Sequence, residues 1–207
     1  MPHQNRVTPE GDIIATPARG TMFGIRGGCF HDAHGRLARR HWASRRWICC
    51  LLEFKGRRRP LLQPGRYTEL FFLDEATAFA AGHRPCFECR RADATRFAEL
   101  WASLANKPAR MSAPDMDLLL HAARLTREAA KRTWRSPLGA LPDGVMVRIA
   151  GVAHLLSGGD LLAWTPAGYT GRLTAEAARV ADVLTPEPTA AIISAGYAPM
   201  LHATARR

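Results

Sequence analysis

The sequence contains no long hydrophobic run and comparatively little negative charge. A membrane-spanning helix needs about 20 consecutive, predominantly apolar residues, and neither such a run nor the apolar region of a secretory signal peptide is present. Only 18 Asp and Glu residues stand against 29 Lys and Arg residues, which gives a formal net charge of +11. We therefore expect a cytoplasmic protein with no membrane partner, whose positive charge favours DNA or RNA.

Several common enzyme patterns are also missing. The glycine-rich stretch 21–30 matches neither the phosphate-binding loop nor the dinucleotide fingerprint, and no Ser-His-Asp or paired-carboxylate arrangement is evident. His31 and His34 lie in the run His-Asp-Ala-His-Gly, which we interpret as a turn because Asp and Gly favour turn positions. The alternative is a metal-binding pair or the general base of a nuclease. No catalytic residue is assigned from the sequence.

The cysteine content and the overall composition further narrow the expected compartment, number of domains and source of the protein. Five cysteines, an odd number, without a signal peptide predict thiols in a reducing compartment and not a disulfide framework. A length of 207 residues with 47% hydrophobic residues allows one large domain or two small ones with a substantial core. The abundance of Arg and Ala is typical of a bacterial protein.

The main candidate for a functional site is one short motif, the C-x-x-C Cys86-Phe87-Glu88-Cys89. Two thiolates at this spacing can bind one metal ion, because the intervening turn brings both sulfur atoms to the same side. Both flanks predict helices. Asp74 is a suitable N-cap for an alanine-rich helix that ends at Gly82, and the apolar residues of 97–104 share one face of a second helix.

The run Ala-Thr-Ala-Phe-Ala-Ala-Gly-His-Arg-Pro-Cys-Phe-Glu-Cys at 76–89 resembles the second half of the zinc domain of Ada-type DNA repair proteins. The resemblance extends over residues 71–101 only. In that family four cysteines bind zinc, and one of them accepts a methyl group from a DNA phosphotriester. The upstream C-x-x-x-C of the family has no counterpart here, since residues 55–60 contain no cysteine. The resemblance thus implies zinc and nucleic acid, and we predict against methyl-acceptor activity.

The third metal ligand is expected from a strand upstream of the motif. The apolar run 47–54 is bounded by charge and predicts a strand. Successive residues of a strand point to opposite faces, so only one of Cys49 and Cys50 can face the metal. We predict zinc bound by Cys86, Cys89 and Cys50, because Cys50 aligns better with the first ligand of the Ada pattern. A redox pair, or two small buried residues, is the alternative.

The segment around the predicted strand 47–54 is strongly basic. Ten Lys and Arg residues lie between positions 36 and 66, where Glu53 is the only acid. Tryptophans are interleaved with them, a composition that favours phosphate contact and base stacking. The predicted nucleic-acid-binding residues are Arg46, Arg57, Arg58, Arg59, Trp42 and Trp47. A solvated surface without a partner is the alternative.

The predicted fold class is α+β. Residues 1–20 predict a loose N-terminal arm, because proline and glycine interrupt any periodicity, and residues 12–14 could form a short strand within it. Residues 21–110 predict an Ada-like metal-binding unit, with a small antiparallel sheet and flanking helices. Residues 111–207 predict a basic helix over 111–134 and then a smaller β-rich unit with a hairpin turn at 157–160.

Together these patterns predict a zinc-stabilised nucleic-acid-binding protein, and the resemblance implies a role in DNA repair or its regulation. Two alternatives are enzymes: a metal-dependent nuclease that uses His31, His34 or His83, and a methyl-acceptor repair protein. A third is a small basic domain whose cysteines are structural and bind no metal. The sequence leaves open whether a reaction is catalysed.

Overall fold

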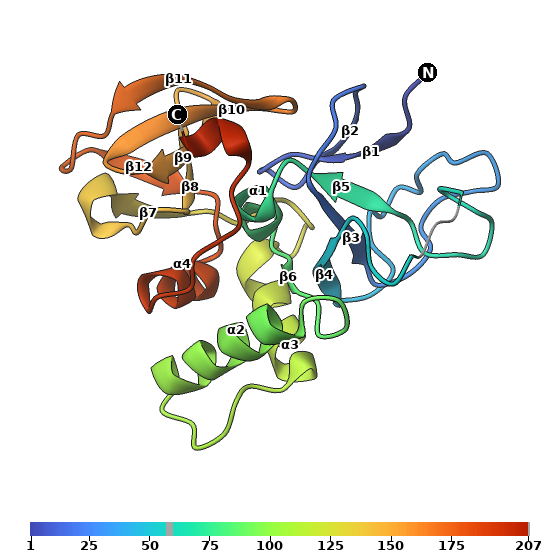
Figure 1. The fold of residues 1–207 in the computed structure, drawn as a ribbon, viewed down its shortest axis with the longest axis horizontal. Coiled ribbons are helices and arrows are strands. Elements are labelled where there is room, and N and C mark those ends of the chain that lie inside the picture. The colour runs from blue at the N-terminus through green and yellow to red at the C-terminus, as the bar shows by residue number, and fades with distance from the viewer. Residues whose placement is uncertain (57–59, 207) are drawn as a thin grey trace.

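The computed structural model describes residues 1–56 and 60–206. It contains two six-stranded sheets with helices between and below them (Figure 1). The presence of both sheets and helices agrees with the α+β class in its coarse form. The first sheet is larger than predicted, because elements outside the expected two or three strands join it.

The first sheet draws on residues from the N-terminus to the C-x-x-C motif. In the order in which they pair, its strands are β2 (Ile13–Ala15), β1 (Gln4–Val7), β5 (Leu70–Phe72), β3 (Met22–Arg26), β4 (Trp47–Leu51) and β6 (Arg84–Pro85). The β1–β5 and β4–β6 pairs are parallel, and the other pairs are antiparallel.

The prediction of a loose arm over residues 1–20 is wrong. Strands β1 and β2 form a hairpin, and β1 lies beside β5. Val7 and Ile13 are buried against the other side chains of this sheet. The two strands are only four and three residues long, so the prolines and glycines around them obscured the alternation of exposed and buried residues.

The inward face of the first sheet packs on helix α1 (Glu75–Ala80). Met22, Cys49, Leu70 and Phe72 are buried there with the alanines of the helix. Asp74 is the N-cap, as predicted, and its carboxylate accepts hydrogen bonds from the amide and hydroxyl of Thr77. The outward face of the sheet is left free for the site described below.

The second sheet is antiparallel throughout. In pairing order its strands are β11 (Gly168–Thr174), β10 (Asp160–Thr165), β9 (Val152–Ser157), β8 (Met146–Ile149), β12 (Val180–Val183) and β7 (Trp134–Pro137). Ser157 pairs with Asp160, which confirms the predicted hairpin turn. Short 3₁₀ helices occur at Leu138–Ala140 and Ala203–Arg206.

A hydrophobic cluster crosses the predicted unit boundary at residues 110 and 111. Phe97 of helix α2 (Arg91–Leu104) and Met116 of helix α3 (Ala113–Arg124) belong to the same buried cluster as Val147 and Ile192. Ile192 lies on helix α4 (Glu187–Ser194). In this cluster α2, α3 and α4 therefore pack against the second sheet, and α1 connects it with the separate cluster beneath the first sheet.

Helix α3 is shorter than the predicted 111–134. It ends at Arg124, and Leu125 is already extended. A turn follows, in which the amide of Ala129 donates to the carbonyl of Thr126. The basic residues of this region therefore do not form one helical stripe. Like charges at helical spacing repel one another, which disfavours continuation of the helix.

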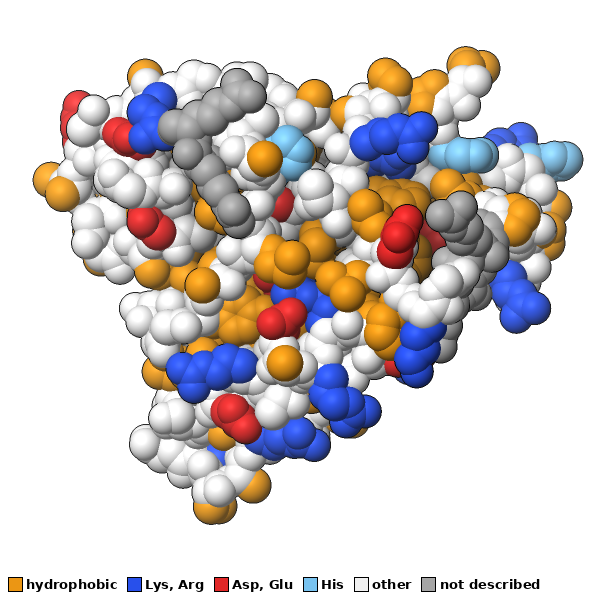
Figure 2. All heavy atoms as spheres, in the orientation of Figure 1, with side chains coloured by type: hydrophobic (Ala, Val, Ile, Leu, Met, Phe, Trp, Pro, Cys, Tyr) orange, Lys and Arg blue, Asp and Glu red, His pale blue; other side chains and the backbone are white. Residues whose placement is uncertain are grey.

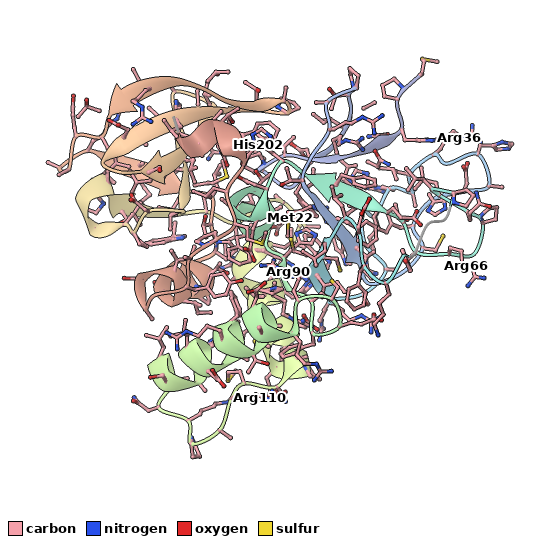
Figure 3. All side chains as sticks on the ribbon, in the orientation of Figure 1. Met22, Arg36, Arg66, Arg90, Arg110 and His202 are labelled. Atoms are coloured by element: carbon pink, nitrogen blue, oxygen red, sulfur yellow. The ribbon has the colours of Figure 1, made fainter. Side chains whose placement is uncertain are left out.

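A buried ion pair links α1, the C-x-x-C motif and the C-terminal tail. The carboxylate of Glu75 accepts a hydrogen bond of 2.5 Å from Arg90, and the two side chains are 0% and 1% exposed. The same carboxylate accepts from the Tyr197 hydroxyl and from the Met200 amide, each at 2.9 Å. Arg90 lies at the centre of the molecule (Figure 3). Its charge is thus neutralised away from water.

We expect Glu75→Gln to lower the free energy of unfolding by about 3–5 kcal/mol, because it leaves a buried guanidinium without its main partner. Urea unfolding followed by circular dichroism measures this change. Asp93→Asn is the matched control. It removes a second partner of Arg90 whose side chain is 45% exposed, so the expected loss is below about 1 kcal/mol. Equal losses in the two variants would contradict the assignment.

Candidate metal centre

The pairing of β4 with β6 brings the C-x-x-C motif beside the cysteines of the sheet. The strands run parallel, with Ile48 opposite Arg84 and Cys49 opposite Pro85. The amide of Cys86 then donates to the carbonyl of Cys49 at 3.0 Å. The next residue of β4 is Cys50, so this register places Cys50 and Cys86 side by side.

Three sulfur atoms meet at this point. Those of Cys50, Cys86 and Cys89 all lie within 4.8 Å of one another. Cys50 and Cys86 are 8% and 6% exposed, and Cys89 is half-buried. Zinc–sulfur bonds of about 2.3 Å in tetrahedral geometry put ligand sulfurs about 3.8 Å apart. The three cysteines could therefore hold a metal ion with only small movements.

The hydrogen bonds around Cys86 favour a thiolate. The thiols of Cys50 and Cys89 donate to its sulfur, and this holds the pKa of Cys86 well below its usual value. The amide of Glu88 also points at that sulfur, at 3.4 Å. Metal ions bind the thiolate and not the thiol, so these donors suit a metal ligand.

Cys49 has a different environment although it is adjacent in sequence. It is 0% exposed and belongs to the core beneath the sheet. Burial raises the pKa of its thiol well above the usual value. The alternation of a strand separates the two cysteines as expected: one faces the cluster and the other faces the core.

The residues before the C-x-x-C fix its position. Gly82 has a positive φ of 86°, and a Cβ atom there would lie 2.5 Å from the Arg124 side chain. Arg84 forms two hydrogen bonds with Asp117 of α3, at 2.8 and 2.9 Å. Gly-x-Arg-Pro thus holds the strand between α1 and α3, and its arginine is not available to a ligand.

A pocket of about 380 Å³ opens beside the three cysteines. Its floor is the outward face of β3, β4 and β5, and it is lined by Phe23, Ile25, Ile48 and Phe71 among others. Glu69 also lines it and is 2% exposed. No sequence pattern indicated Glu69, because a single glutamate has no second residue at a defined separation with which to form a motif.

The Glu69 carboxylate is only partly used by the protein. One oxygen accepts a hydrogen bond of 2.8 Å from the amide of Leu62. The other is buried and has no partner among the described residues. A buried polar atom without a partner is costly and usually has a functional or solvent explanation.

The histidines lie away from the cysteine cluster. His83 is 0% exposed, packs against Trp47 and Phe72, and has a pKa lowered by burial. His31 is within hydrogen-bonding distance of the Thr68 hydroxyl, at 2.7 Å. His34 is exposed in the predicted turn. Among the residues that the structure describes, no other group of metal-binding side chains accompanies the cysteine cluster.

The predicted nucleic-acid residues have mixed positions. Arg46 is exposed and Trp42 is half-buried. Trp47 is 2% exposed, so the prediction that it stacks on a base at the surface is wrong. Successive residues of β4 face opposite sides of the sheet, and Trp47 faces inward, as Cys49 does. Arg57, Arg58 and Arg59 lie outside the described residues.

Comparisons with known proteins give no match to a family model, to a curated protein or to a solved structure. Within the described chain, no helix has the length and apolar character needed to cross a bilayer.

We expect about one zinc ion per chain after purification without added metal, and its loss in both Cys50→Ser and Cys86→Ser. Bound structural zinc contributes apparent folding free energies of about 10–16 kcal/mol in small peptides, so these variants also lose stability. Elemental analysis and thermal unfolding measure both effects.

Cys49→Ser and Cys29→Ser are the controls. Cys49 faces the core and Cys29 is exposed, so both variants should keep the metal. Absence of stoichiometric metal from the parent protein would contradict the site. So would equal metal loss in the Cys49 and Cys50 variants.

Proposed function

We propose that this protein is a zinc protein whose metal is held by Cys50, Cys86 and Cys89 and has one coordination position open to a ligand. The main support is that three sulfur atoms from two separate chain segments lie within 4.8 Å. No fourth Cys, His, Asp or Glu joins them among the described residues. Structural zinc sites generally have four protein ligands, whereas sites that bind substrate have three.

The adjoining pocket supports a ligand of partly apolar character. Its floor consists of aromatic and aliphatic side chains, and its single buried carboxylate belongs to Glu69. When bound, zinc supplies a Lewis acid that polarises an oxygen or stabilises a thiolate. Glu69 is suited to accept a proton from the ligand, because one of its oxygens has no donor among the residues that the structure describes.

Cobalt substitution tests the open position. We expect the cobalt-loaded protein to show the visible bands of a tetrahedral thiolate site, and a small thiol to shift them when it enters the fourth position. A site closed by four protein ligands would not respond. Glu69→Gln should keep the parent spectrum but weaken thiol binding, because the acceptor for the proton of the thiol is lost. An unchanged cobalt spectrum at saturating thiol would rule out the open position.

Nucleic-acid binding is a second proposal, carried by the net charge of +11. Lys and Arg side chains lie over α2 and over the loops at the right of the view (Figure 2). Arg36, Arg66 and Arg110 are exposed and project outward (Figure 3). The resemblance to Ada-type zinc domains supports DNA and a role in repair, and RNA is the other candidate.

The salt dependence of binding tests this proposal. Log affinity for duplex DNA should fall linearly with log salt, with a slope of about −0.9 per phosphate contacted. Changing Arg57, Arg58 and Arg59 together to Ala should flatten the slope by about one unit per Arg. The matched control changes the exposed residues Arg132, Arg135 and Arg179 to Ala. Equal slopes in parent, triple variant and control would contradict a basic binding segment.

A further inference from the structure

A second cavity, of about 530 Å³, lies on the other side of the first sheet from the cysteines. It is bounded by the β1–β2 turn, the end of β3, the segment after α3 and the β8–β9 turn. The segment 41–47 also contributes to the lining, so residues from distant parts of the chain meet around the cavity. Its charged lining includes Glu10, Asp12, Arg26, Arg124, Lys131 and Arg148.

Two of these cations are buried together. Arg26 and Arg124 are 2% and 1% exposed. Their guanidinium carbons lie 4.0 and 3.9 Å from the centre of the Trp47 ring. Contact with an aromatic ring offsets part of the lost hydration of a cation. It does not neutralise the charge, and the two cations also repel each other.

Neither guanidinium has a carboxylate partner among the described residues. Arg26 donates to the carbonyl of Gly11 at 2.9 Å and is 3.4 Å from a nitrogen of His83. Arg124 donates to the carbonyls of Gly82 and Arg45, at 2.9 and 2.7 Å.

One donor of Arg124 has no acceptor within residues 1–56 and 60–206: its Nε is buried there without a partner. Burial lowers the pKa of both arginines, which reflects how unfavourable their charges are in this environment. A buried charge without a counter-charge is strongly destabilising.

The remaining groups do not balance this charge. The Lys131 ammonium group donates to the carbonyl of Ala80, and burial lowers its pKa to about 7. Glu10 is already paired with Arg148, at 3.3 Å. Asp12 is exposed, so it offsets the buried charges only weakly. The cavity thus has an excess of positive charge.

We propose that this cavity binds an oxyanion of the phosphate class, held by Arg26, Arg124 and Lys131. The planar donor fork of arginine matches the spacing of phosphate oxygens. The indole nitrogen of Trp42, which is buried and has no partner among the described atoms, offers a further donor on the cavity wall. This site is separate from the cysteine cluster and does not depend on the zinc proposal.

Inorganic phosphate is the probe. The full-length protein should gain thermal stability with phosphate at constant ionic strength, and calorimetry should give one saturable site. Sodium chloride and sodium acetate are the comparison salts. If phosphate stabilises no more than chloride, the proposal is overturned. If acetate binds as tightly as phosphate, the phosphate class is overturned in favour of carboxylates. This titration of the unmodified protein decides the question by itself.

Lys131→Met adds a sharper readout. It removes one cation but keeps most of the side-chain volume, so phosphate affinity should fall about tenfold or more. Without phosphate, the variant loses the hydrogen bond to Ala80 but also a charge next to two guanidinium groups, so its stability should stay close to that of the parent. A purely structural lysine would give the reverse: lower stability and unchanged phosphate affinity.

Arg127→Gln is the matched control, since Arg127 is exposed in the same segment and does not line the cavity. Equal weakening in this variant would show unspecific attraction and overturn the site. A short DNA duplex is the second probe. If only phosphate binds in a Lys131-dependent manner, the ligand is a small phosphate compound. If the duplex binds more tightly than phosphate and its binding also depends on Lys131, the oxyanion is a backbone phosphate.

Discussion

The buried ion pair between Glu75 and Arg90 holds the central part of this structure together. Arg90 directly follows Cys89, and Glu75 opens α1. The pair therefore fixes the C-x-x-C turn to the helix that supports the first sheet. Tyr197 and the Met200 amide use the same carboxylate, which adds the C-terminal tail. Both charges are away from water, so separating the two side chains is costly. The pair therefore also restricts movement of the cysteine cluster, which Arg90 adjoins.

Strand β4 shows how one short segment serves the core and the site together. Trp47 and Cys49 point inward and are 2% and 0% exposed. Cys50 points outward, to the cluster. A slip of one residue in the pairing would exchange these faces. The register against β3 and β6 is therefore what makes Cys50, and not Cys49, available to a metal.

Local patterns were sufficient for some of these features and insufficient for others. The hairpin at 157–160 and the N-cap Asp74 follow from turn and capping chemistry. Strand alternation showed only that one of Cys49 and Cys50 would face the C-x-x-C, and the choice of Cys50 came from the resemblance to Ada-type zinc domains. The incorporation of residues 4–7 into a sheet depends on pairing with β5, more than sixty residues away. Helix α3 stops where its cations would repel one another. Glu69 and the buried arginines became visible only through burial and missing partners.

The positive charge of this chain has three different physical roles, which composition alone does not separate. Arg84 and Arg90 are buried with carboxylates and serve the fold. Arg66 is exposed, where an isolated charge costs little and has little specificity. Arg26 and Arg124 are buried without a carboxylate among the described residues. Folding must overcome the cost of burying them, so a bound anion would gain most from that pair. The place to look for a specific anionic partner is thus where positive charge is buried, and not where it is most abundant.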